Sequence, residues 1–177
     1  MNMFSRHCRH VALFAAALLL TASPAVYADD IQDANKLLQQ KQYSQAMDKV
    51  DGVLSGKPKD ARARFLKGLI LTEQGNAAEA IKIFLALTED YPEQPEPYNN
   101  LAVLYASQGE YDKAKLSLEM AIRAHPSYAT AHENLGDIYT KMASQAYDRA
   151  LQLDQGNTTT KAKLKMIQDL LNKLITR

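Results

Sequence analysis

A 34-residue period runs through the middle of the chain. Pro58, Pro92 and Pro126 follow one another at this interval, and the same interval relates Gly75 to Gly109. Alanines recur on it as well, at Ala46, Ala80 and Ala114. A repeat of this length is typical of two-helix units that stack to bury a continuous core. The period therefore predicts an all-α fold, and it favours binding to other proteins over catalysis.

The segment up to Ala28 has the organisation of a secretory signal peptide. A basic segment that contains Arg6 and Arg9 precedes an unbroken apolar run at residues 11–20, and small residues follow up to Ala28. The run is shorter than the stretch of about 20 residues that spans a bilayer. We therefore expect cleavage after Ala28 and a periplasmic location, with an uncleaved anchor and a eukaryotic secretory route as alternatives.

Removal of this leader leaves a chain without cysteine and with almost no net charge. Cys8 lies before the apolar run and leaves with the leader, so we expect no disulfide. The leader holds two of the 21 lysines and arginines and none of the 20 acidic residues, so the net charge changes from +1 to −1. This balance gives no general attraction to nucleic acid or anionic lipid, and we expect neither nucleic acid nor membrane as a partner.

The clearest repeat unit covers residues 95–128. Its recurring positions hold, in order, Tyr98, Leu101, Ala102, Tyr105, Gly109, Tyr111, Ala114, Leu118, Ala121 and Pro126. These residue types at this spacing closely resemble the tetratricopeptide repeat. The resemblance implies a right-handed α-solenoid of about three and a half helix pairs. Its units would cover about 27–60, 61–94, 95–128 and 129–154, within a repeat domain at 29–157.

Several recurring residues have an expected structural role. The alanines at the 34-residue interval should lie where two helices cross closely, and Phe84 and Leu118 should fill the space between units. Gly75 suits the turn inside a unit because glycine adopts positive φ without steric cost. Asn76 is expected to cap the next helix, with Glu79 as its reciprocal partner.

Two units depart from the family pattern at single positions. In the second unit Arg64 replaces the first aromatic residue, and Lys67 replaces the usual leucine. In the first unit Lys41 stands at the turn where the later units have glycine.

The fourth unit has lost its internal turn. The span from Tyr139 to Ala150 is five positions shorter than the span between their counterparts, Tyr105 and Ala121. No glycine, proline or asparagine lies between residues 136 and 156. We therefore favour one continuous helix from about 129 to 153, with a tight turn near Ser144 as the alternative.

The chain is expected to end in a helix from about residue 158 to 175, with leucines on one side and lysines mostly on the other. We favour a capping role for residues 158–177, because a solenoid needs a terminal element with a polar outer face. The alternative is a projecting hairpin whose leucine side pairs with another copy or another protein.

In the tetratricopeptide repeat family the first helix of each unit builds a concave groove that holds a partner's peptide. The corresponding positions here are Asn35, Gln39, Arg62, Phe65, Leu69, Thr72, Asn99, Val103, Ala106, Glu133 and Asp137. A peptide could lie on the apolar strip of Phe65, Leu69 and Val103 and bond to Asn99. Glu133 and Asp137 replace the basic residues with which some members grip a terminal carboxylate, so we do not expect carboxylate capture. Packing against a neighbouring helix is the alternative role of Phe65 and Leu69.

The sequence offers little for catalysis. His125 and His132 are the only histidines beyond the leader, and His132 is expected to pack at a position where the family has an aromatic residue. Two histidines without carboxylates at fixed spacing make a poor metal site. No catalytic triad or phosphate-binding loop is evident. We expect no enzyme activity, no cofactor and no metal.

Two functions remain open. The first is a non-catalytic periplasmic scaffold or adaptor that binds a partner peptide or protein surface in its concave groove. The second is a structural envelope protein that self-assembles through its C-terminal helices. The sequence does not specify the partner.

Overall fold

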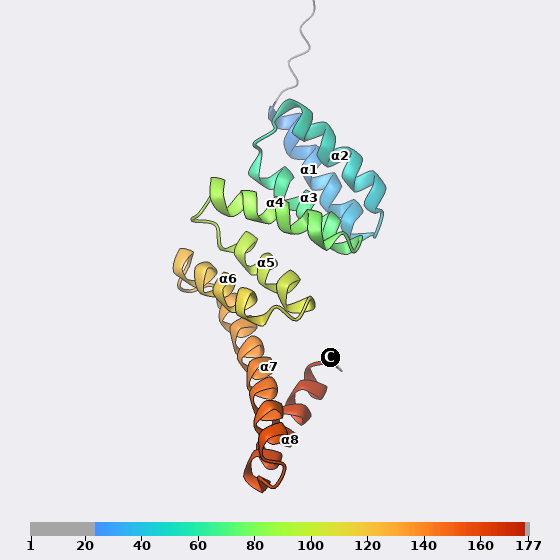
Figure 1. Ribbon diagram of the computed structural model, residues 1–177. Coiled ribbons are helices and arrows are strands. Elements are labelled where there is room, and N and C mark those ends of the chain that lie inside the picture. Colours follow the sequence, from blue (N-terminus) through green and yellow to red (C-terminus); the bar gives the residue numbers. More distant parts are fainter. Residues whose placement is uncertain (1–23, 176–177) are drawn as a thin grey trace, which may run out of the picture.

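The structure, a computed structural model, describes the backbone of residues 24–175 and the side chains of residues 30–172. The described residues form eight helices and no strand (Figure 1). They are α1 (Pro24–Gln39), α2 (Tyr43–Gly56), α3 (Ala61–Glu73), α4 (Ala77–Asp90), α5 (Pro95–Ser107), α6 (Tyr111–Ala124), α7 (Ala129–Leu153) and α8 (Thr158–Ile175). Helices α1 to α6 form three stacked pairs, and α7 leads away from the stack. The predicted all-α solenoid is confirmed.

The three pairs turn through the same backbone geometry. At each turn one residue has positive φ, namely Lys41 (59°), Gly75 (77°) and Gly109 (76°). The amide of the next residue donates to the carbonyl five positions earlier, over 2.8–2.9 Å. This is the glycine-type helix ending that the repeat count predicts. Lys41 adopts the same conformation without being glycine.

The expected cap of α4 does not form. Asn76 stands at the N-cap position, but its side chain makes no capping hydrogen bond, and Glu79 pairs with Lys82 at 2.7 Å instead. The reason is the backbone of Asn76, at φ −84° and ψ 55°, which differs from the extended conformation that aims a cap side chain at the helix. Asp60 has that conformation, and its carboxylate accepts from the Ala63 amide at 2.9 Å.

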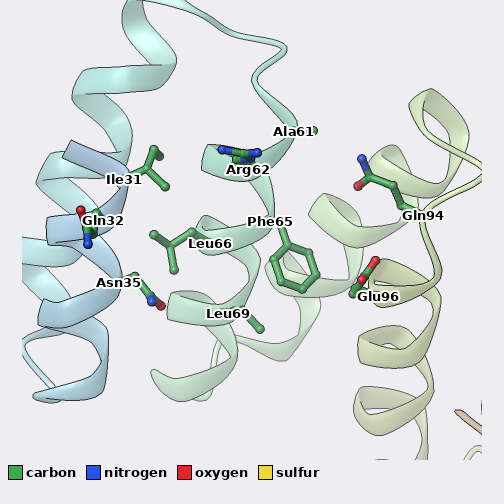
Figure 2. Close-up of a pocket in the computed structure, with 10 residues that line it drawn as sticks. All are labelled: Ile31, Gln32, Asn35, Ala61, Arg62, Phe65, Leu66, Leu69, Gln94 and Glu96. Carbon is green, nitrogen blue, oxygen red and sulfur yellow. The ribbon is translucent and has the colours of Figure 1, made fainter. Parts of the chain in front are cut away.

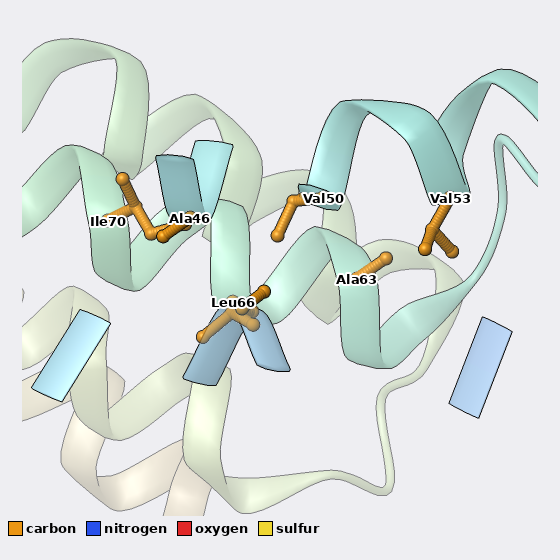
Figure 3. Packing of buried hydrophobic residues seen from close by; sticks show 7 residues of the cluster. Ala46, Val50, Val53, Ala63, Leu66 and Ile70 are labelled. Atoms are coloured by element: carbon orange, nitrogen blue, oxygen red, sulfur yellow. The ribbon is translucent and has the colours of Figure 1, made fainter. Parts of the chain in front are cut away.

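The core consists of successive apolar clusters between neighbouring helices. The first lies between α1, α2 and α3 and includes Ala46, Val50 and Ile70 (Figure 3). The predicted crossing alanines and the predicted space-filling residues are fully buried: Ala46, Ala80, Ala114, Phe84 and Leu118. Each cluster is shared by at least three helices, so every unit depends on its neighbour for burial.

Both departures from the family pattern in α3 are ion pairs between helices. Arg64 reaches Asp90 at the end of α4 with a 2.5 Å contact, and Lys67 reaches Asp51 of α2 at 2.7 Å. The hydrogen bond from Arg64 holds the pKa of the Asp90 carboxyl below its ordinary value. Charged side chains thus connect α3 to its neighbours at positions where the third unit has Tyr98 and Leu101.

Helix α7 is continuous over the residues expected for the fused unit. It has 25 residues and includes Ser144, so the alternative of a tight turn at that residue is wrong. Its length is about 37 Å at the usual rise per residue. Helix α8 follows after a short loop, in which Asn157 accepts a hydrogen bond from the Thr160 amide at 2.9 Å.

Helix α8 ends the array on α7, and its capping role stays a prediction. It packs along α7 and makes at most marginal contacts with the other described helices, so it does not cover α5 and α6 (Figure 1). This is the geometry of the projecting hairpin, which we define as residues 141–153 of α7 together with α8. Fusion of the last pair into α7 carries the chain away from the stack before α8 begins.

The expected signal peptide falls mostly outside the described residues. Residues 1–23 are not described, and residues 24–28 form the start of α1. Within the described part of the chain, no helix is long and apolar enough to cross a membrane.

Candidate functional site

A hollow of about 500 Å³ opens between α1, α3 and the start of α5 (Figure 2). We call it the first hollow. Its apolar wall is formed by Ile31, Phe65, Leu66 and Leu69, and its polar lining by Gln32, Asn35, Arg62, Gln94 and Glu96, with Ala61 at the edge. Arg62, Phe65 and Leu69 follow one another at intervals of three and four positions, so α3 turns one face towards the opening.

The first hollow lies where the inner helices separate. Helix α1 packs against α3, and α5 packs against α7, whereas α3 and α5 make at most marginal backbone contacts with each other in the described structure. Phe65 fills part of this gap with its ring edge-on to Phe84, at 5.6 Å between centroids and 62° between planes. Phe65 and Leu69 are half-buried and line the hollow, so each both packs and faces outward.

A second, smaller hollow of about 180 Å³ lies between α5 and α7. It is lined by Ala102, Val103, Ala106, Leu118, Asn134, Asp137 and Ile138. Val103 is 48% exposed, which is high for an apolar side chain. The lining is mostly apolar, with one carboxylate and one amide at its edge.

One face of α5 connects the two hollows. Glu96 lines the first hollow, and Val103 and Ala106 line the second. These residues and Asn99 are spaced by three, four and three positions and so share one side of the helix. A ligand that follows α5 would therefore meet both hollows.

Asn99 is less accessible than its predicted role requires. Its side chain is 8% exposed, and its Oδ1 accepts a hydrogen bond from Asn134 Nδ2 at 2.8 Å. Asn134, on α7, is the half-buried member of this pair and lines the second hollow. At the second hollow, the side-chain amide that lines the groove therefore comes from Asn134 of α7 and not from Asn99 of α5.

The structure divides the predicted site residues into three sets. Asn35, Arg62, Phe65 and Leu69 line the first hollow, and Val103, Ala106 and Asp137 line the second. Gln39, Thr72, Asn99 and Glu133 line neither. Thr72 donates to the carbonyl of Gly68 in its own helix, at 2.9 Å.

Other lining residues were missed by the sequence analysis. Glu96 stands one 34-residue period after Arg62, so the repeat count could have identified it. Asn134 stands one period after Asn100, which lines neither hollow, so the count gave no signal for Asn134. Gln94 lies in the loop before α5, where the period carries no information about which side chains face the groove.

Three charged side chains of the groove have no ion-pair partner among the described residues. Arg62, Glu133 and Asp137 are exposed, and none of them makes an ion pair among the described residues. Helix α5 contributes Glu96 as its only charged residue. The α7 end of the groove therefore carries two free carboxylates, with Lys141 one turn beyond Asp137.

The two histidines are not arranged for chemistry. His132 is exposed, and its Nε2 lies 2.9 Å from the carbonyl oxygen of Pro126, so the expected packing role is wrong. His125 meets the ring of Tyr128 edge-on at 6.5 Å. Across residues 30–172, no three histidine, cysteine or acidic side chains lie close enough to hold a metal ion.

Comparison with known families matches the chain to a repeat family. The description "Tetratricopeptide repeat" fits residues 37–104 and 71–135, which together make up more than half of the chain.

Two curated proteins are similar to the chain over part of their length. TPR repeat-containing thioredoxin TTL4 of Arabidopsis thaliana is 29% identical over 103 residues, which are 58% of this chain and 15% of that protein. Photosystem I assembly protein Ycf3 of Prochlorococcus marinus (strain MIT 9211) is 28% identical over 102 residues, or 56% of this chain and 59% of that protein. The chain thus spans less than two thirds of either relative.

Two solved structures share the fold. The Sgt2 TPR domain from Aspergillus fumigatus has a TM-score of 0.65 at 18% identity, over 70% of this chain and 83% of that one. The Yersinia enterocolitica type III secretion chaperone SycD, in complex with a peptide of the translocator YopD, has a TM-score of 0.61 at 16% identity, over 68% and 97%. At these identities the similarity concerns the fold alone.

Proposed function

Because this chain belongs to the tetratricopeptide repeat family, we propose that it is a non-catalytic scaffold or adaptor that binds a peptide or surface of another protein in the groove along α1, α3, α5 and α7. Proteins of this family generally mediate protein–protein interaction. The observation that carries the proposal is the first hollow, which is open, about 500 Å³ in volume and walled by Phe65, Leu66 and Leu69. Apolar side chains of a ligand gain free energy by leaving water in such a site.

The polar rim supports the same function. Asn35, Gln32 and Gln94 provide amides around the apolar wall, and such groups can bond to a peptide backbone. The related fold of SycD holds a peptide in its complex.

We further propose that the protein works in the periplasm after loss of residues 1–28. The support is the order of the leader, in which a basic segment, an apolar run and small residues up to Ala28 follow one another.

The groove is tested with a random peptide library displayed on phage and selected on the purified chain that starts at Asp29. Selected peptides are then synthesised, and their affinity is measured by fluorescence polarisation. We expect Phe65→Ala to weaken binding about tenfold or more, because an anchor residue would lose its apolar contact.

Two further variants separate binding from folding. Arg62→Ala changes an exposed residue without an ion pair among the described residues, so it should weaken binding without lowering the melting temperature. Leu116→Ala is the matched control, because Leu116 is 57% exposed on α6 and lines neither hollow of the groove. Groove variants that bind every selected peptide as tightly as the original chain would exclude this site.

Self-association through the hairpin is a second candidate. Leu153, Met166 and Leu170 are 77%, 72% and 47% exposed. Apolar side chains so exposed on two adjacent helices favour a further contact. Light scattering on the purified chain tests it, since a monomer at all accessible concentrations would exclude self-assembly.

A further inference from the structure

The two ends of the groove differ in charge. In the first hollow Arg62 and Glu96 have opposite signs, so the lining carries no net charge around its apolar wall. At the α7 end Glu133 and Asp137 are both negative, and we call them the α7 acids. They are four positions apart on one helix, and therefore share a face.

No described side chain forms an ion pair with the α7 acids. Lys141, one turn beyond Asp137, is half-buried and does not bridge to it. Helix α5, which lies across the second hollow from Asp137, contains no lysine, arginine or histidine. Like charges four positions apart on a helix repel each other, and a cation placed between them removes that cost.

From this asymmetry we propose that the ligand is a peptide with two features: a bulky uncharged apolar residue that enters the first hollow, and a lysine or arginine that reaches the α7 acids. The proposal rests on the groove function above and adds the chemistry of the partner. The apolar anchor supplies most of the binding free energy, because its burial against the apolar wall removes apolar surface from water. The basic residue sets the direction of the peptide along α5 and discriminates against acidic segments.

The same peptide selection tests this inference with one additional pair of variants. Glu133→Gln combined with Asp137→Asn removes both charges and keeps the side-chain shapes. The matched control is Glu89→Gln combined with Asp148→Asn. These are exposed acids outside both hollows, and they too have no ion pair among the described residues. Circular dichroism confirms that both double variants are folded.

We expect the peptides selected on the original chain to contain a large apolar residue and a lysine or arginine at a constant spacing. The neutral double variant should bind them about fivefold more weakly, as expected for exposed ion pairs, and the control should bind unchanged. The difference should shrink as salt rises from about 50 mM to about 500 mM, because the charges are screened. Glu133→Lys combined with Asp137→Lys should instead select acidic peptides.

The outcomes distinguish the inference from the function on which it rests. Peptides that need Phe65 but carry no basic residue, or that bind the neutral double variant equally well, overturn the inference and leave the groove function standing. Acidic peptides selected on the original chain overturn it in the same way. If no selected peptide depends on Phe65, both proposals fall.

Discussion

Gly68 in α3 and Gly136 in α7 occupy the same place in their repeat units, two periods apart, but their surroundings are opposite. A Cβ atom added to Gly68 would lie 2.6 Å from Cζ of Phe84, whereas one added to Gly136 would meet nothing within 4 Å. Helix α4 folds back across α3 and presses Phe84 onto Gly68. In the fourth unit the returning helix has become the continuation of α7. The loss of five residues thus turned a buried helix crossing into open surface.

The same contrast extends to the stack and the hairpin as a whole. Helices α1 to α6 share clusters of buried side chains with their neighbours. Beyond Ile138, Leu164 is the only buried side chain up to residue 172. In a repeat protein stability comes from interfaces between neighbours, so the hairpin should be the less stable part and should open before the stack.

The largest expected effect compares two leucines across this boundary. Leu118 is 0% exposed in the stack, and Leu164 is 9% exposed in the hairpin. Leu118→Ala should lower the free energy of unfolding by about 3–5 kcal/mol, because it leaves a cavity that the closely packed stack cannot fill. Leu164→Ala should cost less than half as much. Urea unfolding followed by circular dichroism measures both, and equal losses would show that hairpin and stack unfold as one unit.

The two glycines give the next largest difference. Gly68→Ala should destabilise the protein by about 1–3 kcal/mol, since the ring of Phe84 must move and is itself fully buried. Gly136→Ala should stabilise it by up to about 1 kcal/mol, because alanine favours the helix and meets no neighbour. Melting temperatures of the two variants should move in opposite directions. A loss at both sites would mean that Gly136 is covered in solution.

Much of the stack could be predicted because each repeat unit is specified by residues close together in the sequence. The turns at Gly75 and Gly109 and the buried alanines follow from residues within one unit, and the continuous α7 follows from its lack of turn-forming residues. The position of α8 could not be predicted in this way. It depends on how far α7 projects past α6, which is a property of the folded stack.

The groove shows the same limit. The repeat pattern placed Arg62, Phe65 and Leu69 on one face of α3, and all three line the first hollow. It could not foresee that Asn99 bonds to Asn134, because this contact joins two units whose separation depends on packing. The cap expected at Asn76 did not form for a related reason, since the turn sets its backbone angles and they differ from the extended conformation of a capping residue.

A smaller effect is expected at the turn of the first unit. Lys41 has a φ of 59°, where the equivalent residues of the next two units are glycines. Lys41→Gly should raise the free energy of unfolding by about 1 kcal/mol, because a side chain is strained in the left-handed conformation. Gly109→Ala should lower it by a similar amount. The urea midpoint should shift at constant slope, and a loss of stability in Lys41→Gly would mean that chain entropy outweighs the strain.

The smallest effect concerns the ion pair by which α3 replaces an aromatic residue. Asp90 binds Arg64 at 2.5 Å, and this contact holds the Asp90 pKa below its ordinary value of 3.8. A lowered pKa in the folded state means that the pair stabilises the protein above the unfolded pKa and is lost as pH falls through the folded one. Asp90→Asn should therefore be slightly less stable than the original chain at pH 7, and the difference should shrink as pH falls below about 4. Thermal melts at several pH values measure the gap. If the difference in melting temperature between the two chains stays constant into acid, Asp90 contributes through hydrogen bonding that asparagine lacks at every pH. The charge of the Arg64–Asp90 pair would then add nothing to stability.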